Sequence, residues 1–191
     1  MVYYTADLHL GHKAIISLCN RPFESMEEMD EVLIRNWNKK VKKNDTVYIV
    51  GDFVWKSQDV QKYLQQLSGK KILIVGNHDK WFEDGTVSEY FLKIAKYDEI
   101  SLEGHPITFC HYPMLEWKNS RKSGTSRLGY LIFGHIHNKV LPEYKPLFST
   151  FNALNAGVDV NHFEPVSFAE LVKNNEEFSR IALEQLGQLN G

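Results

Sequence analysis

Short runs of apolar residues recur along the chain, and most of them end at a glycine or at a polar side chain. The runs are rich in β-branched and aromatic residues, which favour strands, and polar or helix-like segments separate them. We therefore expect strands at residues 2–6, 46–50, 71–75, 97–104, 107–110, 130–133 and 152–158.

Helical spacing of apolar positions marks the segments between the early strands. Residues 25–41 show this spacing, with Ser25 as an N-cap and Glu28 three positions on, which is the pattern of a capping box. Residues 57–69 have a similar apolar stripe and end at a glycine. Residues 167–178 predict a third helix late in the chain.

The order of these elements predicts an α/β fold. Strands and helices alternate in the first half, which favours a mostly parallel sheet with right-handed crossovers. The second half has several strands with few helices between them. It therefore indicates a second sheet, mixed or antiparallel, that packs on the first.

Length and charge narrow the picture further. The chain of 191 residues and 22.2 kDa is long enough for one well-filled core, so we expect a single domain over residues 1–191. Its 22 Lys and Arg against 24 Asp and Glu give a net charge of −2. No overall field attracts nucleic acid or an anionic membrane. A phosphate-bearing partner must be held locally, by a metal or by a few placed cations.

The cysteines and the N-terminal residues bear on location. Cys19 and Cys110 are too few for a disulfide framework, and we expect both to be small core residues. Polar residues follow closely on the first few positions, so no secretory signal is visible, and no apolar run is long enough to span a bilayer. We expect a cytoplasmic protein with reduced thiols and no membrane partner.

Side chains of the kinds that bind metal ions follow the carboxyl ends of the predicted strands. Open α/β sheets bind their substrates and cofactors at these ends. Carboxylate, imidazole and amide groups suit divalent ions such as Mn, Fe and Zn, and the absence of thiolate among them argues against a structural zinc site. A single histidine at a strand end is usually an ordinary hydrogen-bonded residue, but several such groups in one crevice are costly to bury unless a metal neutralises them. The residues are Asp7, His9, Asp52, Asn77, His78, Asp79, His111, His135 and His137.

These residues fall in short motifs: Asp-Leu-His at 7–9, Gly-Asp at 51–52, Gly-Asn-His-Asp at 76–79, His111, and Gly-His-Ile-His at 134–137. In that order the motifs resemble the calcineurin-like metallophosphoesterase superfamily, and within it the short, stand-alone bacterial and phage-type phosphoesterases. The resemblance implies a four-layer αββα sandwich of two mixed β-sheets flanked by helices.

The resemblance also implies two divalent metal ions (Mn, Fe or Zn) bridged by Asp52. One ion's remaining protein ligands would be Asp7, His9 and His137, and the other's would be Asn77, His111 and His135. One position departs from the family pattern, because Trp55 stands where an Asp or Arg usually follows the second motif. We expect metal binding to survive this change, and a substrate contact or a supporting hydrogen bond to be lost or replaced by stacking.

The chemistry expected of such a site is hydrolysis of a phosphate ester by a hydroxide that bridges the two ions. We expect His78 to protonate the leaving oxygen as a general acid, and Asp79 to accept a hydrogen bond from the other nitrogen of that ring. Gly76 would permit the sharp turn that separates these roles.

Three further residues are candidates for substrate binding. His12 either reaches the phosphate or simply begins the helix that follows it. Arg21 either clamps a phosphate oxygen bidentately or is a solvated loop residue. Arg127 belongs to a basic segment between two motif strands, which is either a substrate loop or ordinary surface.

The short interval from His111 to His135 leaves no room for an inserted cap, so the site should be open. An open site suits a phosphodiester, such as a nucleotide or a nucleic-acid end. We therefore expect a metal-dependent phosphoesterase that hydrolyses phosphodiesters. The alternatives are a phosphomonoesterase of small metabolites and a non-catalytic metal-binding scaffold. A nuclease of long polymers is disfavoured, since the chain lacks a basic tract. The sequence indicates neither the oligomeric state nor the native metal.

Overall fold

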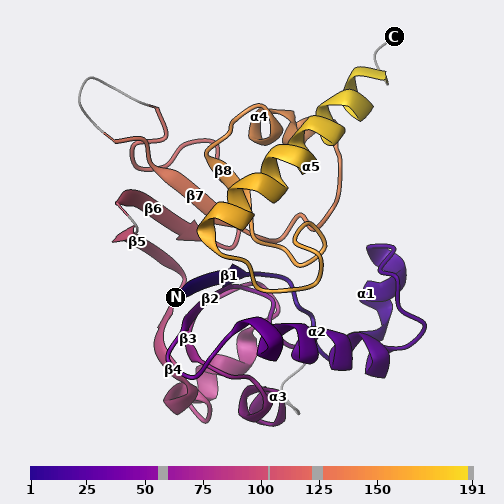
Figure 1. Ribbon diagram of the computed structural model, residues 1–191, viewed down its shortest axis with the longest axis vertical. Coiled ribbons are helices and arrows are strands. Elements are labelled where there is room, and N and C mark those ends of the chain that lie inside the picture. The colour runs from indigo at the N-terminus through magenta and orange to yellow at the C-terminus, as the bar shows by residue number, and fades with distance from the viewer. Residues whose placement is uncertain (56–59, 103, 122–126, 189–191) are drawn as a thin grey trace.

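The computed structural model describes residues 1–55, 60–102, 104–121 and 127–188, which form two four-stranded sheets (Figure 1). The first sheet is parallel throughout, in the order β1 (Val2–Thr5), β2 (Thr46–Val50), β3 (Lys70–Ile74) and β4 (Phe91–Ala95). The second is mixed, because its first two strands are antiparallel and the others parallel: β5 (Tyr97–Leu102), β6 (His105–Cys110), β7 (Tyr130–Phe133) and β8 (Ala153–Asn155).

The helices cover the outer faces of the two sheets. The first half of the chain contributes α1 (Lys13–Leu18), α2 (Met26–Lys40) and α3 (Val60–Gln66). The second half contributes α4 (Lys145–Phe148) and the long α5 (Phe168–Gln188), both beside β7 and β8 in Figure 1. Short 3₁₀ turns are η2 (Lys80–Asp84), η3 (Ser88–Tyr90) and η4 (Pro142–Tyr144). No described helix is long and apolar enough to cross a membrane.

Three apolar clusters divide the protein into four layers. Side chains from both sheets, including Tyr4, Ile74, Phe109 and Leu154, form the cluster between the sheets. The opposite face of the first sheet packs on α2 and α3, and that of the second packs on α4 and α5. Neighbouring strand residues point to opposite faces, so Tyr3 belongs to a helix-side cluster while Tyr4 lies between the sheets. The expected four-layer α/β sandwich is confirmed.

A local signal accounts for the start of α2, and the bounds of two other helices differ from those expected. The Ser25 hydroxyl accepts the Glu28 N–H at 3.1 Å, which is the predicted N-cap of α2. The predicted start of the next helix lies partly outside the described residues, and α3 is seen from Val60 to Gln66. The late helix is longer than expected and continues to Gln188.

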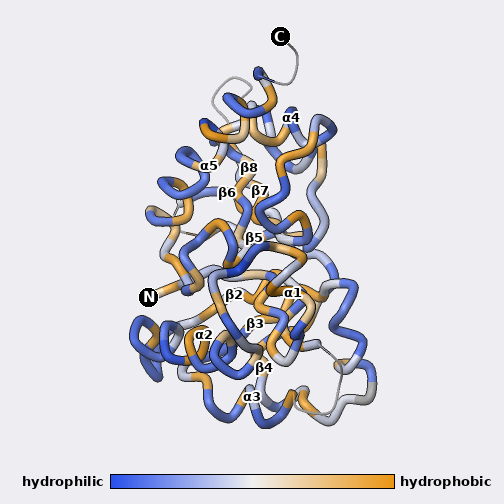
Figure 2. The backbone as a smooth tube through the Cα atoms, turned by 90° about the vertical axis from the view of Figure 1, so that its right-hand side faces the viewer, coloured by the Kyte–Doolittle hydropathy of each residue, from blue (hydrophilic) through white to orange (hydrophobic). Residues whose placement is uncertain are grey.

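One strand was missed. β4 contains Leu92 and Lys93, both exposed, so its sequence has neither a continuous apolar run nor a clean alternation. It lies at the edge of the first sheet, where one side needs no partner strand. In Figure 2 the hydrophobic colour runs along segments of both sheets, while the outer helices alternate between hydrophobic and hydrophilic.

The carboxyl ends of the two sheets meet at one edge of the sandwich. Ala6, just after β1, pairs with Gly157, just after β8, and the Val158 N–H donates to the Ala6 carbonyl at 3.0 Å. A Cβ at Gly134, just after β7, would lie 2.8 Å from the Cβ of Ala6. The loops that follow β1, β7 and β8 are therefore in direct contact. The first motif lies on the loop after β1 and the last motif on the loop after β7, while the other motifs follow β2, β3 and β6.

Candidate metal centre

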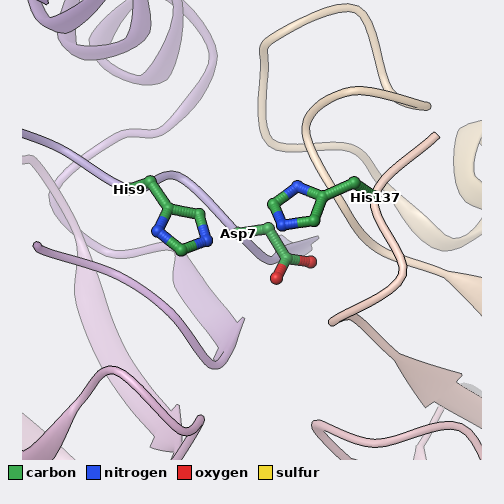
Figure 3. Close-up of side chains that lie close together, drawn as sticks. All are labelled: Asp7, His9 and His137. Atoms are coloured by element: carbon green, nitrogen blue, oxygen red, sulfur yellow. The ribbon is translucent and has the colours of Figure 1, made fainter. Parts of the chain in front are cut away.

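The described part of the chain holds three groups of potential metal ligands, and two of them make up this site. The third, Cys19, His137 and Asp159, shares His137 with the first. In the first, donor atoms of Asp7, His9 and His137 lie within 4.8 Å of one another. The three side chains point toward a common point, from loops of both sheets (Figure 3). In the second group, donor atoms of Asp52, His111 and His135 meet the same distance criterion.

The amide of Asn77 belongs with the second group. Its Oδ1 lies 3.2 Å from His111 Nε2 and 3.0 Å from His135 Nδ1. His111 Nδ1 lies 2.9 Å from the Val50 carbonyl, which can only accept a hydrogen bond. Nδ1 therefore carries a proton, and Nε2 is the nitrogen that could bind a metal after losing its own proton.

The Asp52 carboxylate belongs to the second group and also approaches the first. Its Oδ2 is 3.5 Å from His9 Nε2, 3.4 Å from His111 Nε2 and 4.0 Å from His78 Nε2. His9 Nε2 is buried and has no hydrogen-bond partner in the described part of the chain. A buried nitrogen with no partner is costly, and a cation between this nitrogen and the carboxylate would satisfy both. The donor set thus fits a divalent metal.

The backbone of these loops is unusual. Five of the predicted ligands adopt positive φ, between 51° and 73°: Asp7, His9, Asp52, His135 and His137. Residues other than glycine rarely take this conformation, and strain of this kind clusters at functional sites. Hydrogen bonds hold the strained loops in place, since the His135 N–H donates to the Asp7 carboxylate at 2.9 Å and the Asp7 N–H donates to the Gly51 carbonyl at 2.9 Å.

Gly76 is needed for a different reason from the one expected. Its φ is not positive, so the turn does not require glycine there. A Cβ at this position would instead lie 2.3 Å from Asp52 Oδ1 and 2.6 Å from the Asp52 backbone nitrogen. Gly76 therefore allows the third motif to approach the Asp52 carboxylate closely.

Asp79 has different partners from those expected. Its carboxylate accepts the backbone N–H groups of Asp52 at 2.8 Å, Phe53 at 2.9 Å and Gly76 at 2.9 Å. In the part of the chain that the structure describes, the His78 ring is not among its donors. Asp79 is fully buried, and burial raises its pKa to about 6. It braces the main chain around Asp52 and does not orient the His78 imidazole.

Arg21 is placed differently from both alternatives, the phosphate clamp and the solvated loop residue. Its side chain is completely buried and makes a bidentate pair with Asp159, at 2.8 and 3.0 Å. The same guanidinium donates to the backbone carbonyls of Asp7 and Leu8. It therefore ties the first motif loop to the loop after β8, and no substrate can reach it.

Asp159 is the functional residue that the sequence analysis left without a role. Its Oδ2 lies 2.9 Å from His137 Nδ1, which fixes the proton there and leaves Nε2 to face the first group. A signal was present, because Asp159 directly follows a predicted strand, as the other ligand-type residues do.

Three of these histidines differ in charge when no metal is bound: one is neutral and two are positively charged. Burial lowers the pKa of His9 to about 2, so that imidazole is neutral. Burial also acts to lower the pKa of His111 and His137, but hydrogen bonds to Asp52 and Asp159 outweigh it and raise these pKa values to about 9 and about 10. Two imidazolium groups therefore supply positive charge that a metal cation would replace.

His78 lies at the rim, with its side chain 35% exposed. Its ring packs on His9 at 5.3 Å and on Trp55 at 4.7 Å between ring centroids. Trp55 also stacks face to face on His12 at 3.8 Å. The tryptophan that departs from the family pattern thus forms an aromatic wall with two histidines.

The remaining substrate candidates occupy different places. His12 is the N-cap residue of α1, and its nearly buried Nδ1 lies 3.3 Å from His9 Nδ1. Arg127 is exposed and donates to the Gly104 carbonyl, at the opposite end of β6 from His111. The structure therefore brings His12 to the centre but leaves Arg127 far from it, and residues 122–126 of that loop are outside the described ranges.

Comparison with known proteins agrees with the fold and with the family resemblance. Residues 4–161 match the calcineurin-like phosphoesterase superfamily domain, and the chain belongs to this superfamily, whose members are metal-dependent hydrolases of phosphate esters.

Several individual proteins are similar to this chain. An uncharacterized protein of Methanocaldococcus jannaschii is 33% identical over 175 residues, covering 90% of this chain and 89% of that protein. The gene 66 protein of Mycobacterium phage L5 is 38% identical over 81 residues, which are 40% of this chain and 39% of that protein. The crystal structure of a protein of unknown function from Aquifex aeolicus superposes with a TM-score of 0.68 at 30% identity, covering 91% of this chain and 98% of that chain.

Proposed function

We propose that this protein is a dinuclear-metal phosphoesterase that hydrolyses phosphodiesters. The observation that carries the proposal is the position of Asp52, whose Oδ2 lies 3.5 Å from His9 Nε2 and 3.4 Å from His111 Nε2. A carboxylate between two ligand groups suits a bridge between two cations. Its charge state also suits that role, because burial acts to raise the pKa of Asp52 but the hydrogen bond and charge of His111 hold it at about 2.

The residues that would hold the two ions follow from the two groups. One site would use Asp7, His9 and His137, the other Asn77, His111 and His135, and Asp52 would serve both. Two divalent ions, when bound, neutralise phosphoryl oxygens and acidify water. The ligand types accept Mn, Fe or Zn.

His78 would donate the proton that the leaving oxygen needs. Its Nε2 is 4.0 Å from Asp52 Oδ2, and its exposed edge is open to a substrate. Its backbone N–H donates to Asp52 Oδ1 at 2.9 Å, which fixes the main chain, and Trp55 limits the orientations of the ring. His78 is therefore positioned by packing and by its own peptide, while Asp79 acts on Asp52.

The rim favours a substrate with two substituents on phosphorus. His78 is one-third exposed on one side, and Tyr112, next to His111, is 47% exposed on the other. Both walls can contact groups attached to the phosphate, as a diester requires. The net charge of −2 suits a nucleotide or a nucleic-acid end better than a long polymer.

The test compares bis(p-nitrophenyl) phosphate with p-nitrophenyl phosphate, using metal-stripped protein reloaded with Mn²⁺. We expect metal-dependent turnover of the diester, slower turnover of the monoester, and a loss of about 100-fold or more in kcat for His78→Ala. Turnover restricted to the monoester would instead support the metabolite phosphatase.

A matched control is His162→Asn. His162 is exposed and has a φ of 56°, a conformation that asparagine tolerates, so this variant should keep wild-type turnover. Metal binding without turnover of either compound would support the non-catalytic scaffold.

A further inference from the structure

A hollow of about 430 Å³ opens beside the second ligand group. Part of its wall is the third motif itself, including the ligand Asn77, and another part is Tyr112, which follows His111. The remaining described lining comes from the segments after β3 and β4: Val75, Gly76, Lys80, Phe82, Glu83 and Lys96. The hollow is therefore continuous with the metal centre.

The two lysines reach this hollow from different segments. Lys80 begins η2, directly after the third motif. Lys96 follows β4, and the Val75 N–H donates to the carbonyl of the preceding residue, Ala95, at 2.8 Å. Lys96 thus lies at the carboxyl end of the first sheet, as Asn77 does, although the two are far apart in sequence.

The charge of the hollow is positive. Lys80 and Lys96 are both exposed, and neither has an ion-pair partner among the described residues. Glu83 is the acidic residue in the described lining, so the side chains leave one net positive charge. In a protein of net charge −2, a local excess of cations beside a phosphoryl site suits a second anion on the same substrate.

Aromatic surface accompanies the cations. The Tyr112 ring is 47% exposed and packs edge-on against His135, at 4.7 Å between ring centroids, so it is held in place by a metal-ligand residue. Phe82 lines the same hollow and is half-buried. Two exposed lysines alone would be ordinary solvated surface, but aromatic faces together with cations are the elements that bind a base and its phosphate.

We propose that this hollow binds the nucleoside that remains attached to the scissile phosphate, with its base against Tyr112 and Phe82 and its other phosphate at Lys80 and Lys96. The inference rests on the proposed phosphodiesterase function. The leaving group would lie on the other wall, because His78 packs on His9 and Trp55 and does not line the hollow. The substrate class is therefore a nucleotide with phosphates on both sides of its sugar.

The test uses three diesters with the same p-nitrophenol leaving group. The retained group is methyl in the first, thymidine 5′-linked in the second, and the same thymidine carrying a 3′-phosphate in the third. The wild-type protein with Mn²⁺ should show kcat/KM rising by about fivefold or more from the first to the second, as base stacking contributes. A further rise of about fivefold should follow for the third, and this rise should shrink at high salt.

Each step has its own variant. Tyr112→Ala should bring the ratio of kcat/KM for the thymidine diester to that for the methyl diester down toward one. Tyr112→Phe, which keeps the ring, should preserve this ratio. The double variant Lys80→Gln, Lys96→Gln should abolish the step given by the 3′-phosphate. Lys43→Gln is the matched control, because Lys43 is exposed before the amino end of β2, at the opposite edge of the sheet, and should leave both ratios unchanged.

The outcomes separate this inference from the proposed function. If the methyl diester is hydrolysed with dependence on Mn²⁺ and His78, but the ratios are flat or indifferent to these variants, the hollow is not the nucleoside site while the phosphodiesterase stands. If no diester turns over, the proposed function fails. Binding of thymidine 3′,5′-bisphosphate, measured by calorimetry, then decides the inference, because wild type must bind at least about fivefold more tightly than the double lysine variant.

Discussion

The bracing role of Asp79 makes a sharp prediction for Asp79→Asn. The carboxylate accepts three backbone N–H groups at 2.8–2.9 Å in a fully buried position. An asparagine keeps one acceptor oxygen and turns its NH₂ group toward a backbone donor, so at least one N–H loses its partner. Unsatisfied buried donors cost about 1–3 kcal/mol each, and weaker neutral hydrogen bonds add to this. Removal of the buried charge offsets part of these losses, because burial raises the pKa of Asp79 to about 6 and so penalises the carboxylate in the fold. We expect a net loss of about 2 kcal/mol in the free energy of unfolding.

The assay is unfolding by heat and by urea in the presence of a chelator, so that altered metal affinity does not contribute. For a chain of this size, about 2 kcal/mol corresponds to a fall of about 4–8 °C in Tm. Glu116→Gln is the control, since Glu116 forms an exposed pair with Arg121 and should change stability by less than about 0.5 kcal/mol. A variant that melts like wild type but loses kcat would refute the bracing role and restore Asp79 as the orienter of His78.

Three other predictions test the site. Arg21→Lys should lower stability by about 2 kcal/mol in urea unfolding, because lysine cannot make the buried bidentate pair, whereas an effect confined to KM would point to a substrate clamp. Gly76→Ala should weaken Mn²⁺ binding about tenfold or more in calorimetry, since its Cβ would displace Asp52; unaltered affinity would contradict the close approach. The apparent affinity for Mn²⁺ should rise by about tenfold or more per pH unit between pH 6 and pH 8. The reason is that His111 and His137, with pKa values raised to about 9 and about 10, must lose protons before they can bind metal. An affinity that does not change with pH would contradict these charge states.

Sequence patterns predicted those parts of the structure that depend on local or periodic signals. The Ser25 cap needs only Glu28 nearby. Most strands could be predicted because they are apolar runs with polar ends. The order of the motifs indicated which side chains meet, because parallel strands bring their carboxyl ends to one edge.

Other parts depend on partners that a linear sequence does not show. Arg21 looks like a solvated loop residue until Asp159, 138 positions later, is placed against it. Asp79 is adjacent to His78, yet its carboxylate turns to the backbone of another loop, and adjacency alone cannot reveal that direction. Lys96 reaches the third motif only because β4 pairs with β3, and that strand has no clear pattern.

The most direct test of the central claim is the Mn²⁺ content and the electron paramagnetic resonance spectrum of the metal-stripped protein after reloading, for wild type and Asp52→Asn. The shared position of Asp52 predicts two ions per chain in wild type, with the spectrum of a spin-coupled pair, and loss of that coupling in the variant. One ion per chain, or two ions whose spectrum is uncoupled and indifferent to Asp52, would contradict a bridged dinuclear centre.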